Sequence, residues 1–166
     1  MRDAAVTDAD DTDPIGVVVW PGVYFQVDDF DCHDGTPYPQ QWINLRLIPL
    51  VRVCDTIRLH WGGPVRVVSG YRTPEWNAKI HGAPHSQHPA GRAADIRPYS
   101  SASEPDEPRI KRFHATVLEL WNTGEIPDLG GLGYYPSKWV HVDVRQREPI
   151  GHLAEWTGGG IGSEIA

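Results

Sequence analysis

The run Trp139–Arg145 constrains the fold most strongly, because apolar and polar residues alternate in it without interruption. Its letters, WVHVDVR, place Val140, Val142 and Val144 at every second position. Alternate residues of a β-strand point to the same face of the sheet, so the valines predict a face packed into a core. The opposite face then carries Trp139, His141, Asp143 and Arg145. We interpret the run as a strand with one packed face and one polar, chemically active face.

Two longer stretches have helical periodicity. In Pro108–Asn122 the apolar residues share one face and Gly124 follows the end, which predicts the most distinct helix of the chain. Ile48–Trp61 also carries an apolar stripe, and Pro49 suits the first turn of a helix. An alternative is a helix that begins near Gln40 and is kinked at Pro49.

Shorter elements complete the expected fold. Thr73 and Pro74 predict the N-cap and the first residue of a short helix. Short apolar runs predict further strands at residues 15–20, 65–69, 92–96 and 131–135. Helices and short strands mix without regular βαβ alternation, so we predict an α+β domain.

The ends of the chain differ in composition from its middle. Residues 1–13 hold five aspartates and predict a flexible acidic arm, whereas residues 158–166 predict a glycine-rich extended tail. The domain then spans residues 14–157. The formal net charge is −7 and no basic run is visible, which argues against nucleic acid as a partner. No apolar stretch is long enough to span a membrane.

The two cysteines, Cys32 and Cys54, are too few for a disulfide scaffold. They could pair, but the favoured interpretation is one core thiol and one loop thiol. Neither has CxxC spacing, so ligation of zinc by thiolates is not expected.

The segment Ser86–Asp95 places His88 and Asp95 seven positions apart, with small residues and a glycine between them. A turn there can bring the imidazole and the carboxylate to one point, and both groups are good zinc ligands. His141, on the polar face of its strand, can supply a third ligand. Three protein ligands leave a fourth position for water, which is the pattern of a catalytic zinc site. Another divalent ion would also fit these ligand types.

Several motifs, taken in order, resemble those of the M15 zinc peptidases, which include D-Ala-D-Ala carboxypeptidases and peptidoglycan endopeptidases. The resemblance covers roughly residues 20–147, and the Hedgehog signalling domain shares the fold. The motifs are Ser69–Pro74, Asn77, Gly82–His88, Gly91–Asp95, Gly133–Tyr135 and His141–Asp143. The resemblance implies that His88, Asp95 and His141 bind one zinc ion. It also implies a Hedgehog/DD-peptidase-like fold, with a small antiparallel sheet under the metal and flanking helices.

The resemblance also suggests roles for the neighbours of the metal. Arg72 matches an arginine that lies near the metal and helps to bind substrate or the developing oxyanion, for which a guanidinium is well suited. Ser86 and Gln87 are expected to position His88 or to line the site. Tyr135 and Trp139 are candidates for a substrate wall, although aromatic residues are more often part of a core.

The general base is the least defined part of the site. Many members of the family have an acidic residue three positions before the last histidine, where this chain has Lys138. Other members have a histidine two positions before it, where this chain has Trp139. Asp143 is the nearest acid on the correct strand face, so we nominate it for proton transfer or for support of a ligand. The alternative is a structural carboxylate paired with Arg72 or Arg145.

The expected activity is hydrolysis of peptide bonds in bacterial peptidoglycan, with wall peptides as partners. The replacement of the acid by Lys138 keeps open a non-catalytic alternative, a metal-binding structural or wall-binding module of a phage or phage-like particle. The N-terminus lacks a charged and then apolar signal segment. We therefore expect synthesis in the cytoplasm and delivery to the wall by a phage lysis system or by a particle.

Overall fold

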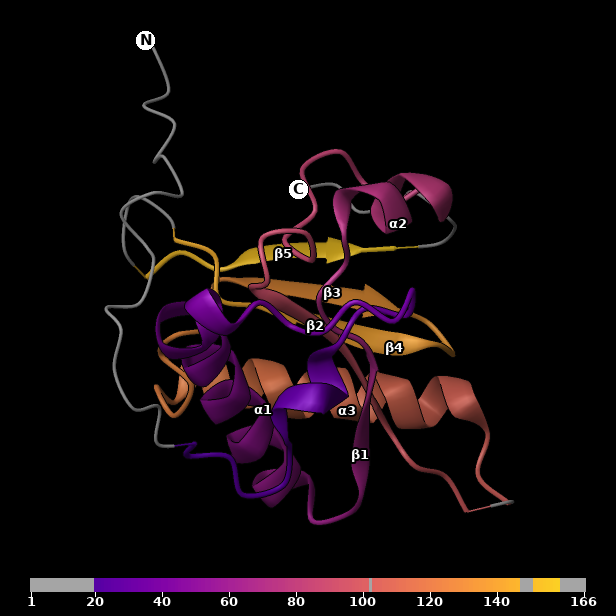
Figure 1. The fold of residues 1–166 in the computed structure, drawn as a ribbon. Helices are drawn as coiled ribbons and strands as arrows, with labels where there is room; N and C mark the ends of the chain where they lie inside the picture. Colours follow the sequence, from indigo (N-terminus) through magenta and orange to yellow (C-terminus); the bar gives the residue numbers. More distant parts are fainter. Residues whose placement is uncertain (1–19, 102, 147–150, 159–166) are drawn as a thin grey trace, which may run out of the picture.

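A computed structural model describes residues 20–101, 103–146 and 151–158, and its centre is a five-stranded sheet (Figure 1). The strands stand in the order β1-β2-β4-β3-β5. Their bounds are Val65–Ser69 for β1, Ala93–Pro98 for β2, Gly131–Tyr135 for β3, Trp139–Asp143 for β4 and Ala154–Thr157 for β5. Together with the helices, this sheet makes the protein an α+β domain, as the sequence predicts.

The sheet is mixed, which corrects the expectation of an antiparallel one. β1 pairs with β2, β2 with β4, and β4 with β3, all in antiparallel orientation. β5 is instead parallel to β3, with Gly133 opposite Trp156. β5 lies in the last part of the predicted domain, but its sequence, AEWT, is too short to predict a strand by alternation.

The two long helices match their predictions closely. α1 covers Ile48–Trp61, and α3 covers Asp106–Asn122, two residues earlier than expected. Asp106 and Glu107 lie in the first turn of α3, where the helix dipole favours carboxylates. Helical backbone also precedes α1, because a 3₁₀ turn η3 (Gln40–Trp42) and a π-helical turn η4 (Ile43–Leu47) run directly into it. Both alternatives for this region therefore hold in part.

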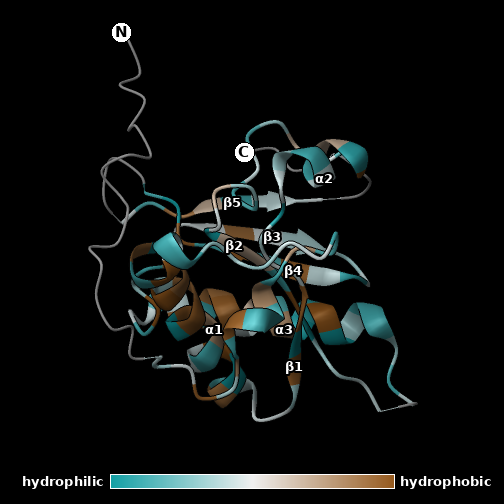
Figure 2. Ribbon diagram, viewed as in Figure 1, coloured by the Kyte–Doolittle hydropathy of each residue, from teal (hydrophilic) through white to brown (hydrophobic). Residues whose placement is uncertain are grey.

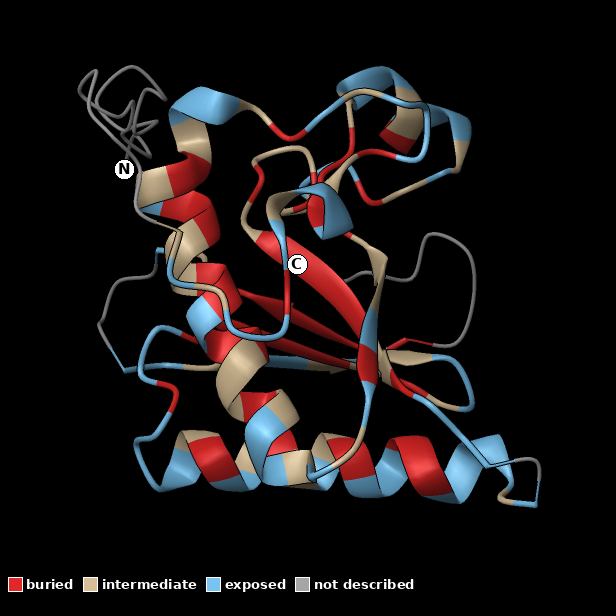
Figure 3. Ribbon diagram, turned by 60° about the horizontal axis from the view of Figure 1, so that its bottom comes forward, coloured by how far each residue is buried: buried red, intermediate tan, exposed pale blue. Residues whose placement is uncertain are grey.

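The hydrophobic core lies between the sheet and these helices, which cover the same face of it (Figure 1). Figure 2 shows hydrophobic residues concentrated on α1, α3 and the strands, and Figure 3 shows buried residues recurring at intervals along both helices and on the strands. Val140 and Val142 are fully buried, as the alternation predicts. The members of the stripe on α1 are also buried; they are Leu50, Val53, Cys54 and Ile57.

Figure 1 shows the short helix α2 (Pro74–Lys79) and the loops around it across the sheet from α3. This helix begins as predicted, because the Thr73 side chain accepts a hydrogen bond from the backbone N–H of Trp76. Turns then occupy the region between α2 and β2, and Figure 1 shows this region over the edge of the sheet. A 3₁₀ turn η2 (Val27–Phe30) lies beside β1.

Cys32 and Cys54 are both buried and do not form a disulfide. Cys54 lies on α1 and Cys32 in a loop, but both belong to the hydrophobic core, so the favoured interpretation of one core thiol and one loop thiol holds only in part. Within the described ranges, no helix has the length and the apolar character that crossing a bilayer requires. The predicted acidic arm, the strand at residues 15–20 except Trp20, and the tail beyond Gly158 lie outside the described residues.

Candidate metal centre

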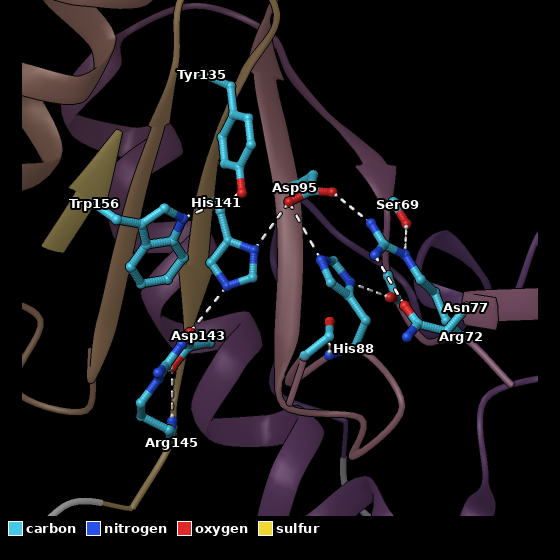
Figure 4. Close-up of polar contacts among 12 residues, drawn as sticks. Ser69, Arg72, Asn77, His88, Asp95, Tyr135, His141, Asp143, Arg145 and Trp156 are labelled. Atoms are coloured by element: carbon cyan, nitrogen blue, oxygen red, sulfur yellow. Dashed lines mark hydrogen bonds and ion pairs between the residues drawn. The ribbon is translucent and has the colours of Figure 1, made fainter. Parts of the chain in front are cut away.

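The three residues that the sequence predicts as metal ligands come together on the polar face of the sheet (Figure 4). Asp95 and His141 are direct neighbours in the register of β2 and β4, whereas His88 comes from the loop before β2. All three are buried, and one potential ligand atom from each lies within 4.8 Å of the others. His88 Nε2 is 3.3 Å and His141 Nδ1 is 3.0 Å from the same Asp95 oxygen, Oδ1.

His88 is held in place by hydrogen bonds of its backbone and of its ring. Its carbonyl oxygen accepts from the backbone N–H of Arg72 and of Gly91, and its own N–H donates to Ser86 Oγ. The ring Nδ1–H donates to the carbonyl oxygen of Gly70 at 2.6 Å. When the ring is neutral, donation from Nδ1 leaves the lone pair on Nε2, which is the nitrogen that faces Asp95.

Asp95 uses its two carboxylate oxygens for different partners. Oδ1 faces the two histidines, while Oδ2 accepts from the Arg72 guanidinium at 2.9 Å. Burial raises the pKa of Asp95, but the charges of His88 and His141 and their hydrogen bonds outweigh that effect and hold it well below the usual range. Asp95 is therefore an anion, which is the form that binds metal.

A chain of charged groups holds His141 through its Nε2 atom. Its Nε2–H donates to Asp143 Oδ2 at 2.9 Å, and Arg145 donates to both oxygens of Asp143 at 2.7 and 2.6 Å. Burial raises the pKa of Asp143, yet the hydrogen bonds from Arg145 and His141 bring it far below the usual range. A carboxylate behind a histidine ligand sets the tautomer and the orientation of the ring.

The donor set fits a zinc ion. Two imidazole nitrogens and one carboxylate oxygen are typical zinc ligands, and a tetrahedral ion places its ligands about 3.4 Å apart when the bonds are roughly 2.0–2.2 Å long. The observed separations of 3.3 and 3.0 Å are close to that spacing. The second nitrogen of each ring is hydrogen bonded in the way that metal-binding histidines usually are.

Two glycines of β3 make room for the polar face of the sheet. Gly131 is opposite Asp143 and Gly133 is opposite His141 in the strand register. A Cβ atom on Gly131 would lie 2.2 Å from Asp143 Oδ2, and one on Gly133 would lie 2.6 Å from the indole nitrogen of Trp156. The site therefore needs glycine at both positions. The spacing of these two glycines by two residues in the sequence is a signal of close approach.

The other predicted site residues lie around the three ligands. Arg72 is buried and donates to Ser69 and Asn77 as well as to Asp95. Ser86 contacts His88 as expected, and the carbonyl oxygen of Gln87 accepts from the backbone of Arg92. The rings of Tyr135 and Trp139 pack 5.5 Å apart at one end of β3 and β4. Asp143 is paired with Arg145, which is the structural alternative left open by the sequence.

Four residues of the site have no role in the sequence prediction, or only an alternative one. The carbonyl oxygen of Gly70 and the side chain of Asn77 hold His88 and Arg72, and both residues stand in the motifs quoted above. Arg145 was predicted only as an alternative partner of Asp143. Trp156 lies 5.1 Å from the ring of His141 and donates to the Tyr135 hydroxyl at 3.1 Å. No pattern in the sequence indicates Trp156, because its position depends on the parallel pairing of β5.

A buried His-Asp-His cluster on the sheet of an α+β domain is a site that could hold a metal ion. Comparison with family models then places the chain in a particular family. The model described as peptidase M15 matches residues 23–143, so the chain belongs to the M15 peptidases, a family of metallopeptidases that typically use zinc. The match includes all three potential ligands. Searches of the curated proteins and of the solved structures found no match.

Proposed function

We propose that this protein is a zinc peptidase that hydrolyses peptide bonds of bacterial peptidoglycan, as a DD-carboxypeptidase or as an endopeptidase. The observation that carries the proposal is the buried cluster of His88, Asp95 and His141 in a chain of the M15 family. A Hedgehog/DD-peptidase-like arrangement of the fold and delivery by a phage lysis system or particle belong to the same proposal.

The residues of the chain supply the ligands and hold them in position. His88 Nε2, Asp95 Oδ1 and His141 Nδ1 would bind one zinc ion, which lowers the pKa of a bound water and polarises a carbonyl group. Arg72 keeps Oδ2 of Asp95 turned away from the two histidines. The ligand geometry is thereby fixed before any metal or substrate arrives.

Asp143 is better suited to positioning than to proton transfer. Both of its oxygens accept hydrogen bonds from Arg145, and Oδ2 also accepts from His141. Its side chain is completely buried, and its pKa is lowered by these same groups. A general base needs hydrogen-bond access to the proton that it removes. We therefore assign Asp143 to the orientation of His141.

The positive charge of Arg72 near the cluster suits a substrate with a free carboxylate, such as a wall peptide. Peptidoglycan stem peptides end in a free carboxylate, and a guanidinium is a permanent donor that matches a carboxylate. Arg72 lies beside Asp95, and its substrate-binding role is part of this proposal.

A second candidate is a metal-binding or wall-binding module without turnover. Two observations favour it: Lys138 stands where many members of the family have an acid, and Asp143 is engaged by Arg145. This candidate has the same metal site but predicts no cleavage.

Incubation with purified muropeptides separates the two candidates. The zinc-loaded protein is expected to produce new fragments, detected by liquid chromatography and mass spectrometry, that are absent with His141→Ala and with the chelated protein. His60→Ala is the matched control, since His60 is exposed on α1 and pairs with Glu125. Bound zinc without any fragment would favour the module without turnover. Cleavage by the chelated protein would contradict the metal mechanism.

A further inference from the structure

Tyr135 and Trp156 form a hydrogen-bonded pair beside the metal ligands. The indole N–H of Trp156 donates to the Tyr135 hydroxyl at 3.1 Å, and the indole ring lies 5.1 Å from the ring of His141. The guanidinium of Arg145 lies 5.1 Å above the same indole. Trp156 therefore packs against the potential ligand His141 and against Arg145, which holds the Asp143 carboxylate behind that ligand.

The position of Trp156 is determined by β5, which lies outside the part of the chain that matches the family model. The match ends at residue 143, and β5 covers Ala154–Thr157. Gly133 is opposite Trp156, and only a residue without a Cβ leaves space for the indole there. Gly158 likewise leaves space for the Tyr135 ring, because a Cβ at that position would lie 2.1 Å from the ring. β5 thus packs against the site through side chains that fit together closely.

The Tyr135 side chain points from the end of β3 toward the space between His141 and Asp95 (Figure 4). Tyr135 is 5% exposed, so the residue is largely buried. The polar groups on the other sides of the cluster already serve the ligands: Asp143 holds His141, and Arg72 holds Asp95. The Tyr135 hydroxyl approaches the cluster from a side that neither Asp143 nor Arg72 occupies (Figure 4).

We propose that the Tyr135 hydroxyl is a catalytic hydrogen-bond donor to the substrate oxygen that becomes negatively charged during peptide hydrolysis, and that Trp156 is its positioning residue. The identity of that oxygen rests on the proposed function. The direction of the hydroxyl and its bond to Trp156 do not.

The chemistry of the pair supports this assignment. A phenol that accepts a hydrogen bond from an indole N–H becomes a stronger donor through its own O–H, since neighbouring hydrogen bonds polarise one another. A donor directed at a developing oxyanion in a buried site contributes about 10²- to 10³-fold to turnover. The ring of Trp156 also limits the positions that the phenol can adopt.

Binding of acetohydroxamate to the zinc-loaded protein tests the donor without any turnover. Its oxygen anion would accept from Tyr135, so we expect Tyr135→Phe to weaken binding by roughly tenfold or more in calorimetry. Trp156→Phe, which removes the indole N–H, is expected to weaken it by roughly 3- to 10-fold. Tyr134→Phe is the matched control, because Tyr134 lies on the same strand and packs against His114.

Zinc affinity and thermal unfolding, measured for each variant, separate catalysis from structure. We expect Tyr135→Phe to retain wild-type zinc affinity and melting temperature. Its kcat on muropeptides should fall about 100-fold with little change in KM, because an oxyanion exists only in the transition state. Wild-type hydroxamate affinity in Tyr135→Phe overturns the inference, and so does loss of zinc or of folding. Absence of muropeptide cleavage by the wild-type protein counts against the proposed function alone.

Discussion

At the residue scale, Asp95 connects the two histidines of the site to Arg72. One of its oxygens faces His88 and His141, and the other is bound to Arg72. Both members of the Arg72–Asp95 pair are buried, and removing one partner of such a pair costs about 3–5 kcal/mol because the other charge is left uncompensated. Arg72 therefore contributes to the site through Asp95 even without substrate.

Asp143 provides a direct test of how the second histidine is held. Replacement of Asp143 by Asn keeps the shape of the side chain but removes the charge that orients His141 Nε2–H and binds Arg145. We expect zinc affinity to fall roughly 10- to 100-fold, which is the usual effect of losing such a partner. Competition with a zinc chelator of known affinity measures this change.

Glu119→Gln is the control for Asp143→Asn, since Glu119 is an exposed carboxylate of α3 on the other side of the sheet. It should bind zinc as tightly as the wild type. Equal zinc affinity in Asp143→Asn and in the wild type would show that the carboxylate does not support His141.

At the scale of elements, β3 depends on the absence of side chains on its polar face. Ala in place of Gly133 would put a Cβ 2.6 Å from the Trp156 indole nitrogen, so β5 or the indole would have to move. Overpacking of this kind costs typically about 1–3 kcal/mol. We expect a lower melting temperature for Gly133→Ala and a change in tryptophan fluorescence as Trp156 leaves His141.

Gly63→Ala is the matched substitution for comparison. A Cβ there would meet only the Trp61 side chain, at an ordinary contact distance of 3.6 Å. Its melting temperature should stay near that of the wild type. The packing of Trp156 against Gly133 would be refuted if both substitutions had equally small effects.

The elements differ in how much their sequences reveal. α1, α3 and β4 could be predicted because each has one apolar face in the period of its own structure, and that face meets the core. The same alternation placed His141 and Asp143 on one side of β4. The pairing of β5 could not be predicted, because a four-residue strand carries no usable period and its parallel partner is distant in sequence.

The residues of the site also differ in whether the sequence alone can predict them. His88, Asp95 and His141 have ligand chemistry of their own and stand in specific motifs, so the sequence identifies them. Trp156 and the carbonyl oxygen of Gly70 act by location alone. Neither has a chemistry that distinguishes it from any other tryptophan or backbone carbonyl, so only the folded structure assigns them.

At the scale of the whole molecule, the metal site links stability to pH. Burial lowers the pKa of His141, but its hydrogen bonds to Asp143 and Asp95 and the charges of both carboxylates raise it to about 10. In the chelated protein this raised pKa contributes stability that is complete below about pH 6.5 and is lost as pH rises through about 10. The lowered pKa values of Asp95 and Asp143 contribute stability that is lost only in acid.

Zinc binding has the opposite dependence on pH, because the metal must displace a proton from His141. We expect apparent zinc affinity to rise between pH 6 and pH 8, by up to roughly tenfold per pH unit. Free zinc at about 100 times Kd would add about 2.7 kcal/mol, which raises the melting temperature by roughly 5–11 °C. Thermal scans of chelated and zinc-loaded protein at several pH values measure the difference, and a difference that does not change with pH would contradict the proton displacement.

The most direct test of the central claim is a calorimetric titration of the chelated protein with zinc. The cluster of His88, Asp95 and His141 predicts tight binding of about one ion per chain in the wild type and in His60→Ala. His141→Ala should lose this tight binding while remaining folded by circular dichroism. Failure of the wild type to bind zinc, or binding by His141→Ala as tight as that of the wild type, would contradict the assignment of this site.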